Sequence, residues 1–427
     1  MQNYFKQALA SLRSQPMASW TTIAGTTLAI FLIMVTVMME DIRIAPYAPE
    51  SGRDRWLVHR FTSIKNNNWG NDQSSNAGFN TKVAKAVFMA METPEAVTTL
   101  SIAPSEALVS MSNGKSFGAQ LLDVDHGFWK VMDFTFISGT PFGEAEFESA
   151  QPVAVISESV ARKLFGSTDV TGRRIEIDHN PYRVIGVVRD VSTLAHDAYA
   201  DVWVPYTTTN TAKNKFNEYL GSLKAIILPH SREEIPKVRE EYDRLWAKLG
   251  DEAKEDGWEF IPRDRPYDQE TAVNTMWANV DPDMASVRKS QYIIWAVLLL
   301  VPAVNLSSMT HSRLSRRREE IGVRRAFGAT RGEILTDLFV ENLIITLFSG
   351  LLGLLLSVMF AFFGTSMIFA EASVTGEVTH LTAGMLLNWH VFGLALIFCL
   401  VLNLLSATLP AWQASRTNVV NAIAGKK

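Results

Sequence analysis

Four long apolar runs dominate the pattern of hydrophobic and polar positions along the chain. They cover residues 19–39, 290–309, 339–364 and 389–409. A run of about 20 apolar residues is long enough to cross a hydrocarbon core of about 30 Å as a helix. One such run could be the core helix of a soluble domain. Four runs with charged segments between them predict an α-helical membrane protein with four transmembrane helices.

The segment between the first two runs, residues 40–289, has a different pattern. Its length of about 250 residues suits one domain or two small ones. Val153–Ile156 predicts a buried strand, and Ser157 is placed to cap the helix that follows. Residues 172–190 predict two strands around an Asp-His-Asn-Pro turn. Apolar positions at helical spacing predict a helix over residues 231–250, with a terminal glycine. This segment is therefore predicted to be a large α+β domain inserted between the first and second spans.

Three further segments complete the expected organisation. Residues 200–206 predict another short strand, and the polar stretch 63–78 predicts an exposed loop. At the start of the chain, residues 1–18 predict an amphipathic interfacial helix that ends before the first span.

The distribution of basic residues predicts the orientation of the spans. The loop 310–338 holds seven arginines, and the leading segment and the tail 410–427 also carry basic residues. By contrast, the loop 365–388 has no lysine or arginine. Basic loops stay in the cytoplasm, so we expect a multi-pass protein of the cytoplasmic (inner) membrane. Both termini are then cytoplasmic, and residues 40–289 are extracytoplasmic, in the periplasm.

Composition and motifs give no support for catalysis. The formal net charge of −4 does not argue for nucleic acid, and a single cysteine, Cys399, excludes an internal disulfide. The eight histidines are scattered, and no P-loop, HExxH or GxSxG motif is present. Asp123, Asp125 and His126 lie close together, and we interpret them as an exposed turn. We expect a non-catalytic chain that binds no cofactor or metal.

A charged segment stands between the second and third spans. Residues 319–335, which we name the elbow, carry charges of both signs and three glycines. Gly328 is placed to end a helix in a left-handed conformation. Thr330 and Glu333 fit a capping box that starts the helix of the third span. The physics leaves two interpretations open: a docking surface for another protein, or a basic anchor that meets lipid headgroups.

The elbow and the span after it, "EEIGVRRAFGATRGEILTDLFVENLIITLFSGLLGLLLS", resemble the signature of the MacB/FtsX-type ABC transporter permeases. The stretches "TTIAGTTLAIFLIMV", "PVAVISESVARKLFGSTDVTGRRIEI" and "TLPAWQASRTNVVNAI" are similar to other parts of that family. Val419 stands where the family often has proline and Ile423 where it often has leucine, and little is recognised over residues 208–287.

The resemblance implies a set of partners. It implies an ATPase subunit bound in trans, with ATP and Mg held by that subunit, because no ATPase domain is fused to this chain. It also implies a second permease subunit, identical or related, and a periplasmic adaptor is a candidate further partner. The family's coupling helix, which docks on the ATPase, maps onto residues 319–332 of the elbow. The docking residues are then Glu319, Glu320, Ile321, Gly322, Arg324, Arg325, Ala326, Gly328, Ala329, Thr330, Arg331 and Glu333.

Two functions follow from the resemblance. In the first, ATP-driven motion is relayed through the spans to the periplasmic domain, which is called mechanotransmission, and the protein exports or extracts a peptide, an antibiotic or a lipoprotein. In the second, an FtsX-like regulator moves no substrate and activates an extracytoplasmic partner such as a cell-wall hydrolase. The large size of the periplasmic domain favours the first.

Overall fold

The computed structural model describes residues 16–68, 73–111, 114, 116–275, 277–298, 300, 323, 327–368, 392–394, 396–397 and 400–401. The chain divides into two compact units. The outer domain is formed by Ile42–Met284 together with Ser366–Leu381. The helical unit is formed by Met1–Asp41, Ala285–Thr365 and Thr382–Lys427. The predicted interfacial helix 1–18 lies outside the described residues except for its last three positions, which are helical.

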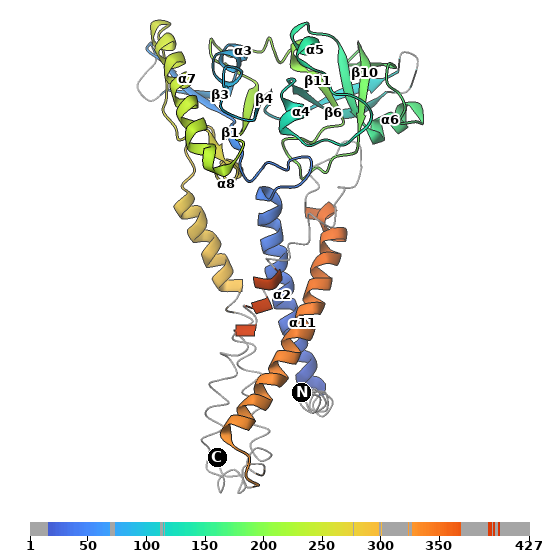
Figure 1. Cartoon of the computed structure of the whole chain (residues 1–427), viewed down its shortest axis with the longest axis vertical. Coiled ribbons are helices and arrows are strands. Elements are labelled where there is room, and N and C mark those ends of the chain that lie inside the picture. Colours follow the sequence, from blue (N-terminus) through green and yellow to red (C-terminus); the bar gives the residue numbers. More distant parts are fainter. Residues whose placement is uncertain are drawn as a thin grey trace. The chain divides into compact units, whose positions relative to one another are not determined.

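The outer domain is built from short strands, with few helices, and its elements appear in Figure 1. The strands are β1 (Leu57–His59), β2 (Thr62–Asn66), β3 (Ser75–Phe79), β4 (Ala96–Ser101), β5 (Ser105–Ser110), β6 (Phe117–Val124), β7 (Phe136–Gly139), β8 (Val153–Ser157), β9 (Arg174–Ile177), β10 (Asn180–Val188), β11 (Val202–Pro205), β12 (Leu220–Gly221), β13 (Leu223–Leu228), β14 (Trp258–Phe260) and β15 (Tyr267–Asp268). The helices are α3 (Thr81–Val83), η1 (Ala84–Phe88), α4 (Phe128–Val131), α5 (Glu144–Glu148), α6 (Glu158–Phe165), η2 (Tyr206–Thr208), η3 (Arg232–Glu234), α7 (Ile235–Glu255) and α8 (Gln269–Val273).

One half of the outer domain is a closed ring of strands. The strand order β11-β8-β10-β9-β5-β6 closes on itself because β11 also pairs with β6. Both the β6–β11 and the β8–β10 pairings are parallel. Every strand of the ring contributes apolar side chains to one buried cluster, which also takes Val160, Ala161 and Leu164 from α6. Closure leaves no ring strand with an unpaired edge.

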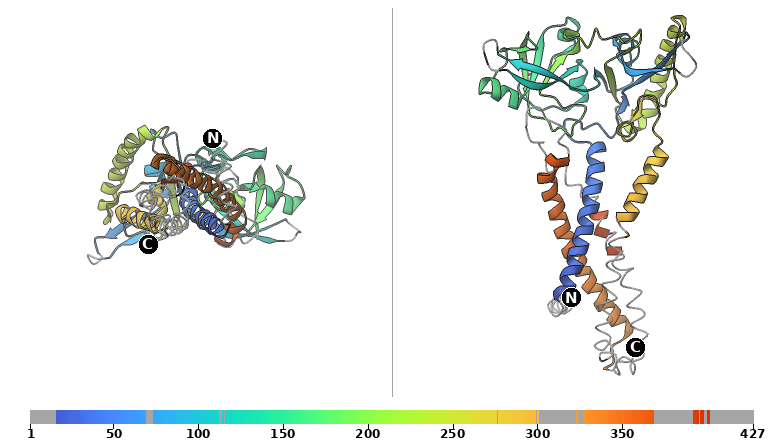
Figure 2. Two further views of the ribbon diagram at one scale, coloured as in Figure 1. Left: turned by 90° about the horizontal axis from the view of Figure 1, so that it is seen from below. Right: turned by 180° about the vertical axis from the view of Figure 1, so that it is seen from behind.

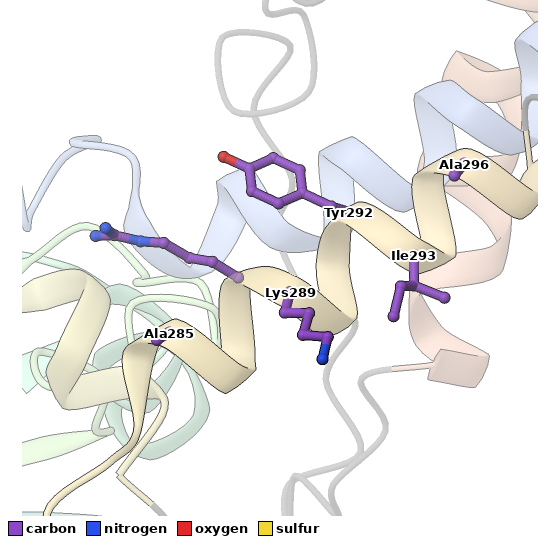
Figure 3. A pocket seen from close by; sticks show the side chains of 6 residues that line it. Ala285, Lys289, Tyr292, Ile293 and Ala296 are labelled. Atoms are coloured by element: carbon purple, nitrogen blue, oxygen red, sulfur yellow. The ribbon is translucent and has the colours of Figure 1, made fainter.

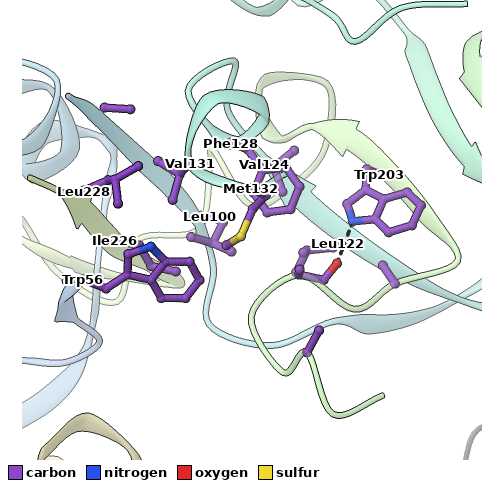
Figure 4. Packing of buried hydrophobic residues seen from close by; sticks show 14 of the residues in the cluster. Trp56, Leu100, Leu122, Val124, Phe128, Val131, Met132, Trp203, Ile226 and Leu228 are labelled. Atoms are coloured by element: carbon purple, nitrogen blue, oxygen red, sulfur yellow. Dashed lines mark hydrogen bonds between the residues drawn. The ribbon is translucent and has the colours of Figure 1, made fainter. Parts of the chain in front are cut away.

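The other half of the outer domain is organised around β13. This strand pairs with β1, β3 and β4, and β3 continues through β2 to β14. The long amphipathic helix α7 covers this half, and its buried Val238, Tyr242 and Leu249 pack into a cluster with η1. A third cluster joins the two halves, with Trp56 and Ile226 from one and Phe128 and Trp203 from the other (Figure 4).

Several sequence predictions for the outer domain are confirmed. β8 is followed by α6, and the Ser157 side chain accepts a hydrogen bond from the Val160 amide. β9 and β10 are joined at Asp178 and His179, which both have positive φ. That conformation is what a two-residue hairpin turn needs, because it matches the twist of the flanking strands. The short strand near residue 202 is β11. The α+β class of the domain is correct.

Three sequence predictions for this domain are wrong. Residues 63–66 and 75–78 of the stretch 63–78 are not an exposed loop, because β2 and β3 pair there and Ile64 is fully buried. The helix predicted to end at Gly250 continues to Glu255, because the buried apolar face extends to Leu249 and Ala253. The turn at Asp123 and Asp125 is buried rather than exposed.

The helical unit contains α2 (Pro16–Ile44) and α11 (Arg331–Ile368), and residues 284–298 are also helical. Among the described residues, two segments are long and apolar enough to cross a membrane: Ile23–Ile44 and Leu343–Phe360. They coincide with the predicted first and third spans. Most of the fourth predicted span, 389–409, and about half of the second, 290–309, lie outside the described residues, so the count of four stays a prediction.

His59, buried in the half around β13, gives the outer domain a measurable pH dependence. Its ring nitrogens lie 2.9 Å from the Thr62 and Tyr242 hydroxyls, and its ring packs against Phe88 and Trp246. Burial, with the nearby charge of Arg265, holds the pKa of His59 well below its ordinary value of 6.5. The histidine is therefore neutral in the folded state and gains a proton more readily in the unfolded state.

We expect this linkage to destabilise the domain as the pH falls below about 6.5. Relative to His59→Gln, which keeps a polar side chain without titrating, the wild type should lose about 1.4 kcal/mol of unfolding free energy between pH 7.5 and 5.5. Pulse proteolysis of the full chain in urea measures the difference. Parallel pH profiles of the two proteins would contradict the assignment. Burial raises the pKa of Glu50, so this residue changes stability with pH in the opposite direction. Its contribution is the same in both proteins and cancels when their pH profiles are compared.

Candidate coupling site

The described part of the elbow is a helical turn with a sharp end. The Phe327 amide donates to the Val323 carbonyl at 3.1 Å, as in the last turn of a helix. Gly328 follows with φ +95°, in the left-handed region where a side chain is disfavoured. The predicted glycine cap is confirmed.

A capping box starts the next helix. The Glu333 amide donates to the Thr330 hydroxyl at 3.2 Å, and the Thr330 amide donates to the Glu333 carboxylate at 2.9 Å. This reciprocal pair satisfies two amides that the first helical turn of α11 leaves without partners. The start of α11 is therefore held by its own capping box, as the sequence predicted.

The elbow presents an apolar side chain to its surroundings. Phe327 is 88% exposed and Val323 is 46% exposed. Thr330, Gly332 and Glu333 around them are also exposed. A large aromatic ring on a rigid turn loses little conformational freedom when a partner buries it, and aromatic residues are enriched among the anchors of protein interfaces. The sequence analysis did not single out Phe327.

The structure describes only part of the predicted docking set. Gly328, Ala329, Thr330 and Glu333 lie together in the turn and capping box, and the backbone of Arg331 begins α11. The following predicted residues lie outside the described ones: Glu319, Glu320, Ile321, Gly322, Arg324, Arg325 and Ala326.

α11 packs closely against α2, and the two helices cross in Figure 1 and in the right view of Figure 2. The Thr27 hydroxyl donates to the Ser349 carbonyl at 3.3 Å. A Cβ added at Gly353 would lie 2.9 Å from Ile30 Cβ and 3.0 Å from the Thr27 carbonyl oxygen. We name this contact, formed by Thr27, Ile30, Ser349, Gly350 and Gly353, the α2–α11 seam. Small residues here let the two backbones approach, as they do between transmembrane helices in general.

Two arginines hold the last turn of α2, whose residues from Ile42 onward belong to the outer domain. Arg53 donates to the Ile42 carbonyl at 2.8 Å and to the Leu194 carbonyl at 3.0 Å. Arg43 donates to the Val273 carbonyl at 2.6 Å, at the end of α8. In return, Gln269 donates to the Arg43 carbonyl at 3.2 Å. The Arg53 guanidinium thus donates to a carbonyl at the C-terminal end of α2, where a positive charge is favourable.

A buried charged cluster lies behind this junction. Glu50 pairs with Arg53, and its carboxylate accepts the amides of Asp197 and Ala198, each at 2.7 Å. Asp197 in turn accepts the Lys224 ammonium at 2.5 Å. All four charged side chains of the cluster, Glu50, Arg53, Asp197 and Lys224, are buried. The sequence analysis missed this cluster, although the lysine in the apolar strand "LKAIIL" was a signal.

The electrostatics of the cluster follow from burial and pairing. Burial raises the pKa of Glu50 to about 7, although Arg53 opposes the shift. Burial alone would also raise the pKa of Asp197, but Lys224 and Arg60 outweigh it and hold that pKa below its ordinary value. Burial lowers the pKa of Lys224 against the attraction of Asp197. Asp197 and Lys224 therefore form an ion pair in which each charge stabilises the other.

Asp125 has a structural role rather than a catalytic one. Its carboxylate accepts the hydroxyls of Thr98 and Thr99, each at 2.7 Å, and the Phe128 amide at 3.1 Å. These bonds fix the start of α4. Asp123 accepts the Thr211 hydroxyl at 2.5 Å. Among the described residues, no group of three or more His, Cys, Asp or Glu is placed to hold a metal ion.

A shallow hollow lies on the helix formed by residues 284–298. It is lined by Ala285, Arg288, Lys289, Tyr292, Ile293 and Ala296, which all belong to this one helix. Figure 3 shows Lys289 and Tyr292 pointing away from the helix in different directions. A hollow without a second wall does not enclose a small molecule. The exposed apolar residues here are typical of a helix that meets lipid or another helix.

Comparison with protein families matches nearly the whole chain. Residues 19–249 match the MacB-like periplasmic core domain. Residues 292–419 match the FtsX-like permease C-terminal region.

Similar proteins are ABC transporter permeases. An uncharacterised ABC transporter permease, YknZ of Bacillus subtilis, is 22% identical over 77% of this chain and 76% of its own length. The macrolide export ATP-binding/permease protein MacB of Burkholderia cenocepacia is 24% identical over 95% of this chain. The match covers only 57% of that MacB protein, so this chain spans little more than half of its length.

Solved structures similar to this chain are extracytoplasmic domains. The extracellular domain of a noncanonic ABC-type transporter YknZ from Gram-positive bacteria covers 47% of this chain and 100% of its own, with 18% identity and a TM-score of 0.31. The periplasmic region of MacB from Actinobacillus actinomycetemcomitans covers 51% and 94%, with 19% identity and a TM-score of 0.32. Because the two family matches account for both the outer domain and the helices that follow it, the chain belongs to the MacB-like, FtsX-like family of ABC transporter permeases.

Proposed function

We propose that this chain is a permease subunit that works by mechanotransmission. A separate ATPase subunit, which holds ATP and Mg, docks on the elbow. Its motion is passed through the spans to the outer domain, which exports or extracts a peptide, an antibiotic or a lipoprotein. The observation that carries this proposal is the continuity of α11, a single helix of 38 residues that begins at the exposed elbow and includes the α2–α11 seam.

The contacts along this route suit the transmission of force. A helix of this length extends about 57 Å, and its hydrogen-bonded backbone moves as a stiff rod. The seam couples α11 to α2 because the hydrogen bond from Thr27 and the close approach at Gly353 leave no room for sliding. At the other end of α2, Arg53 donates to the Ile42 carbonyl and Arg43 to the Val273 carbonyl, both within the outer domain. α2 itself continues without a break from the seam to Ile42–Ile44, which belong to the outer domain.

The remaining features of the assembly are part of the same proposal. The functional unit is a dimer of permease subunits, identical or related, with two ATPase subunits on the cytoplasmic side. Both termini and the elbow face the cytoplasm, and the outer domain faces the periplasm. A periplasmic adaptor is a candidate partner of the outer domain. The support for this arrangement is the arginine-rich loop 310–338 and the family match.

The docking role of the elbow is tested by substitutions at the exposed Phe327 and at Arg324 and Arg325, which the sequence predicts to dock. In the complex with the ATPase that co-purifies with the chain, Phe327→Ser and the double change Arg324→Glu/Arg325→Glu should each lower ATPase stimulation by about tenfold or more, because they remove an anchor residue or reverse charge at the interface. Phe327→Leu should retain most of the stimulation.

Phe216→Ser is the matched control, because Phe216 is 65% exposed but belongs to the outer domain. It should leave ATPase stimulation unchanged. If the elbow variants bind and stimulate the ATPase like the wild type, the elbow does not dock the ATPase, and the interpretation as a lipid anchor is favoured instead. Co-purification of a cell-wall hydrolase without an export adaptor would favour the regulatory function over transport.

A further inference from the structure

The loop that ends the outer domain is fixed in place by buried and half-buried side chains. Ala278 O accepts the Ser63 hydroxyl at 3.1 Å and the Arg265 guanidinium at 2.5 Å. Arg265 is itself mostly buried and also donates to the Phe61 carbonyl at 2.5 Å. The loop is therefore fastened to the chain just before and within β2.

Two further residues hold the second part of the loop. Arg263 donates to the Asn279 carbonyl at 2.5 Å and pairs with Asp281 at 3.2 Å. The Tyr267 hydroxyl donates to the other oxygen of the Asp281 carboxylate. Together these bonds hold residues 277–281 in a defined conformation, and we name this segment the Trp277 loop.

This rigid loop presents apolar side chains outward. Trp277 is 68% exposed and Val280 is 56% exposed, although the Ala278 and Asn279 carbonyls between them both accept hydrogen bonds. The free energy gained by burying a tryptophan side chain is several times the thermal energy. A fixed and exposed tryptophan therefore favours binding to an apolar surface. An aromatic ring with a polar N–H group is the side chain preferred at a membrane–water interface.

The position of the Trp277 loop in the outer domain indicates what covers it. The loop follows α8, whose last residue, Val273, accepts the hydrogen bond from Arg43 in the final turn of α2. That turn belongs to the segment Ile23–Ile44, which is long and apolar enough to span a membrane. At its other end the loop leads directly into the helix 284–298, where the second predicted span begins. The loop thus lies at the end of the outer domain from which the chain enters the membrane.

We propose that the Trp277 loop is a membrane contact, in which Trp277 and Val280 enter the headgroup region of the leaflet that faces the outer domain. The occupant is the lipid surface itself rather than a protein. The contact adds a third attachment of the outer domain to the membrane, besides α2 and the helix 284–298. This proposal goes beyond the coupling function and does not require the ATPase.

The test uses the full chain in lipid nanodiscs of phosphatidylethanolamine and phosphatidylglycerol. Cys399 is replaced by serine, and a single cysteine is introduced by Val280→Cys, which leaves Trp277 in place. A polarity-sensitive fluorophore on this cysteine is then quenched with lipids that carry a nitroxide on the headgroup. Phe216→Cys is the matched control, since the turn after Phe216 packs against Asn80 at the start of α3, and α3 and α8 lie at opposite ends of the outer domain in Figure 1.

We expect the label at position 280 to be quenched several-fold more strongly than the label at position 216, and Trp277→Ser in the same protein to reduce that quenching. Equal quenching at the two positions overturns the proposal. A label at position 280 that is protected from aqueous iodide but not quenched by the nitroxide lipid also overturns it, because a protein surface then covers the loop. Loss of ATPase stimulation in the elbow variants leaves these outcomes unchanged, so the two proposals fail separately.

Discussion

Asp197→Ala is expected to lower the unfolding free energy of the outer domain by about 3–5 kcal/mol, because it leaves the Lys224 ammonium buried without a counter-ion. The ion pair is fully enclosed, with the ammonium 2.5 Å from the carboxylate. Its loss also leaves Arg60 without the negative charge that faces it. Part of the cost is avoided at high pH, where the isolated Lys224 releases its proton. Urea unfolding of the full chain followed by pulse proteolysis measures the change.

Two further variants separate the loss of the Asp197–Lys224 attraction from the cost of leaving the Lys224 ammonium buried and unpaired. Asp197→Leu combined with Lys224→Met should regain most of the stability, because apolar residues of similar volume can replace a buried pair. Asp251→Ala removes the carboxylate of an exposed pair with Lys254, and it should change stability by less than about 1 kcal/mol. If Asp197→Ala and Asp251→Ala had similar effects, the buried pair would contribute no more than a surface one.

Gly353→Leu is expected to separate α2 from α11. The new side chain begins at a Cβ only 2.9 Å from Ile30 Cβ and 3.0 Å from the Thr27 carbonyl oxygen, so the backbone of α2 has to move. Overpacking of this kind costs about 1–3 kcal/mol or more. A disulfide or short cross-link between Thr27→Cys and Ser349→Cys, in a chain with Cys399→Ser, reports the seam in native membranes. The cross-linked fraction should fall several-fold in Gly353→Leu.

Gly25→Leu provides the matched control for the seam. Gly25 lies on α2, but a Cβ at this position meets nothing within 4 Å. The same side chain added there should leave cross-linking unchanged. If both leucine variants cross-link like the wild type, the close approach at Gly353 does not determine how the two helices pack. If both lose the cross-link equally, the effect belongs to the bulk of leucine in either helix and not to the seam.

Local patterns in the sequence predicted those features whose causes are local. Ser157 and Gly328 act through the backbone next to them, and the Thr330–Glu333 capping box connects residues one helical turn apart. The long apolar runs identified α2 and α11 for the same reason, since a transmembrane span is a run of consecutive apolar residues. These features could be found without knowing which strands meet.

Features that depend on distant residues could not be found in this way. Lys224 lies in an apolar strand, and its partner Asp197 stands in an irregular segment with no periodicity. Burial of Ile64 depends on β2 lying between β3 and β14, and β14 comes almost two hundred residues later. The Trp277 loop falls in the region 208–287, which carries no recognised motif, and its rigidity comes from Ser63 and Arg265.

The pairing of β1 with β15 has a consequence for how the outer domain is inserted in the chain. Leu57 lies opposite Asp268 and Val58 opposite Tyr267, so the first and last strands of the domain are neighbours. The polypeptide therefore enters and leaves the domain at almost the same place. A domain with adjacent ends behaves as a cassette, because its removal or exchange changes little in the spacing of the segments that flank it. Evolution could enlarge or replace such a cassette while the surrounding membrane helices kept their register.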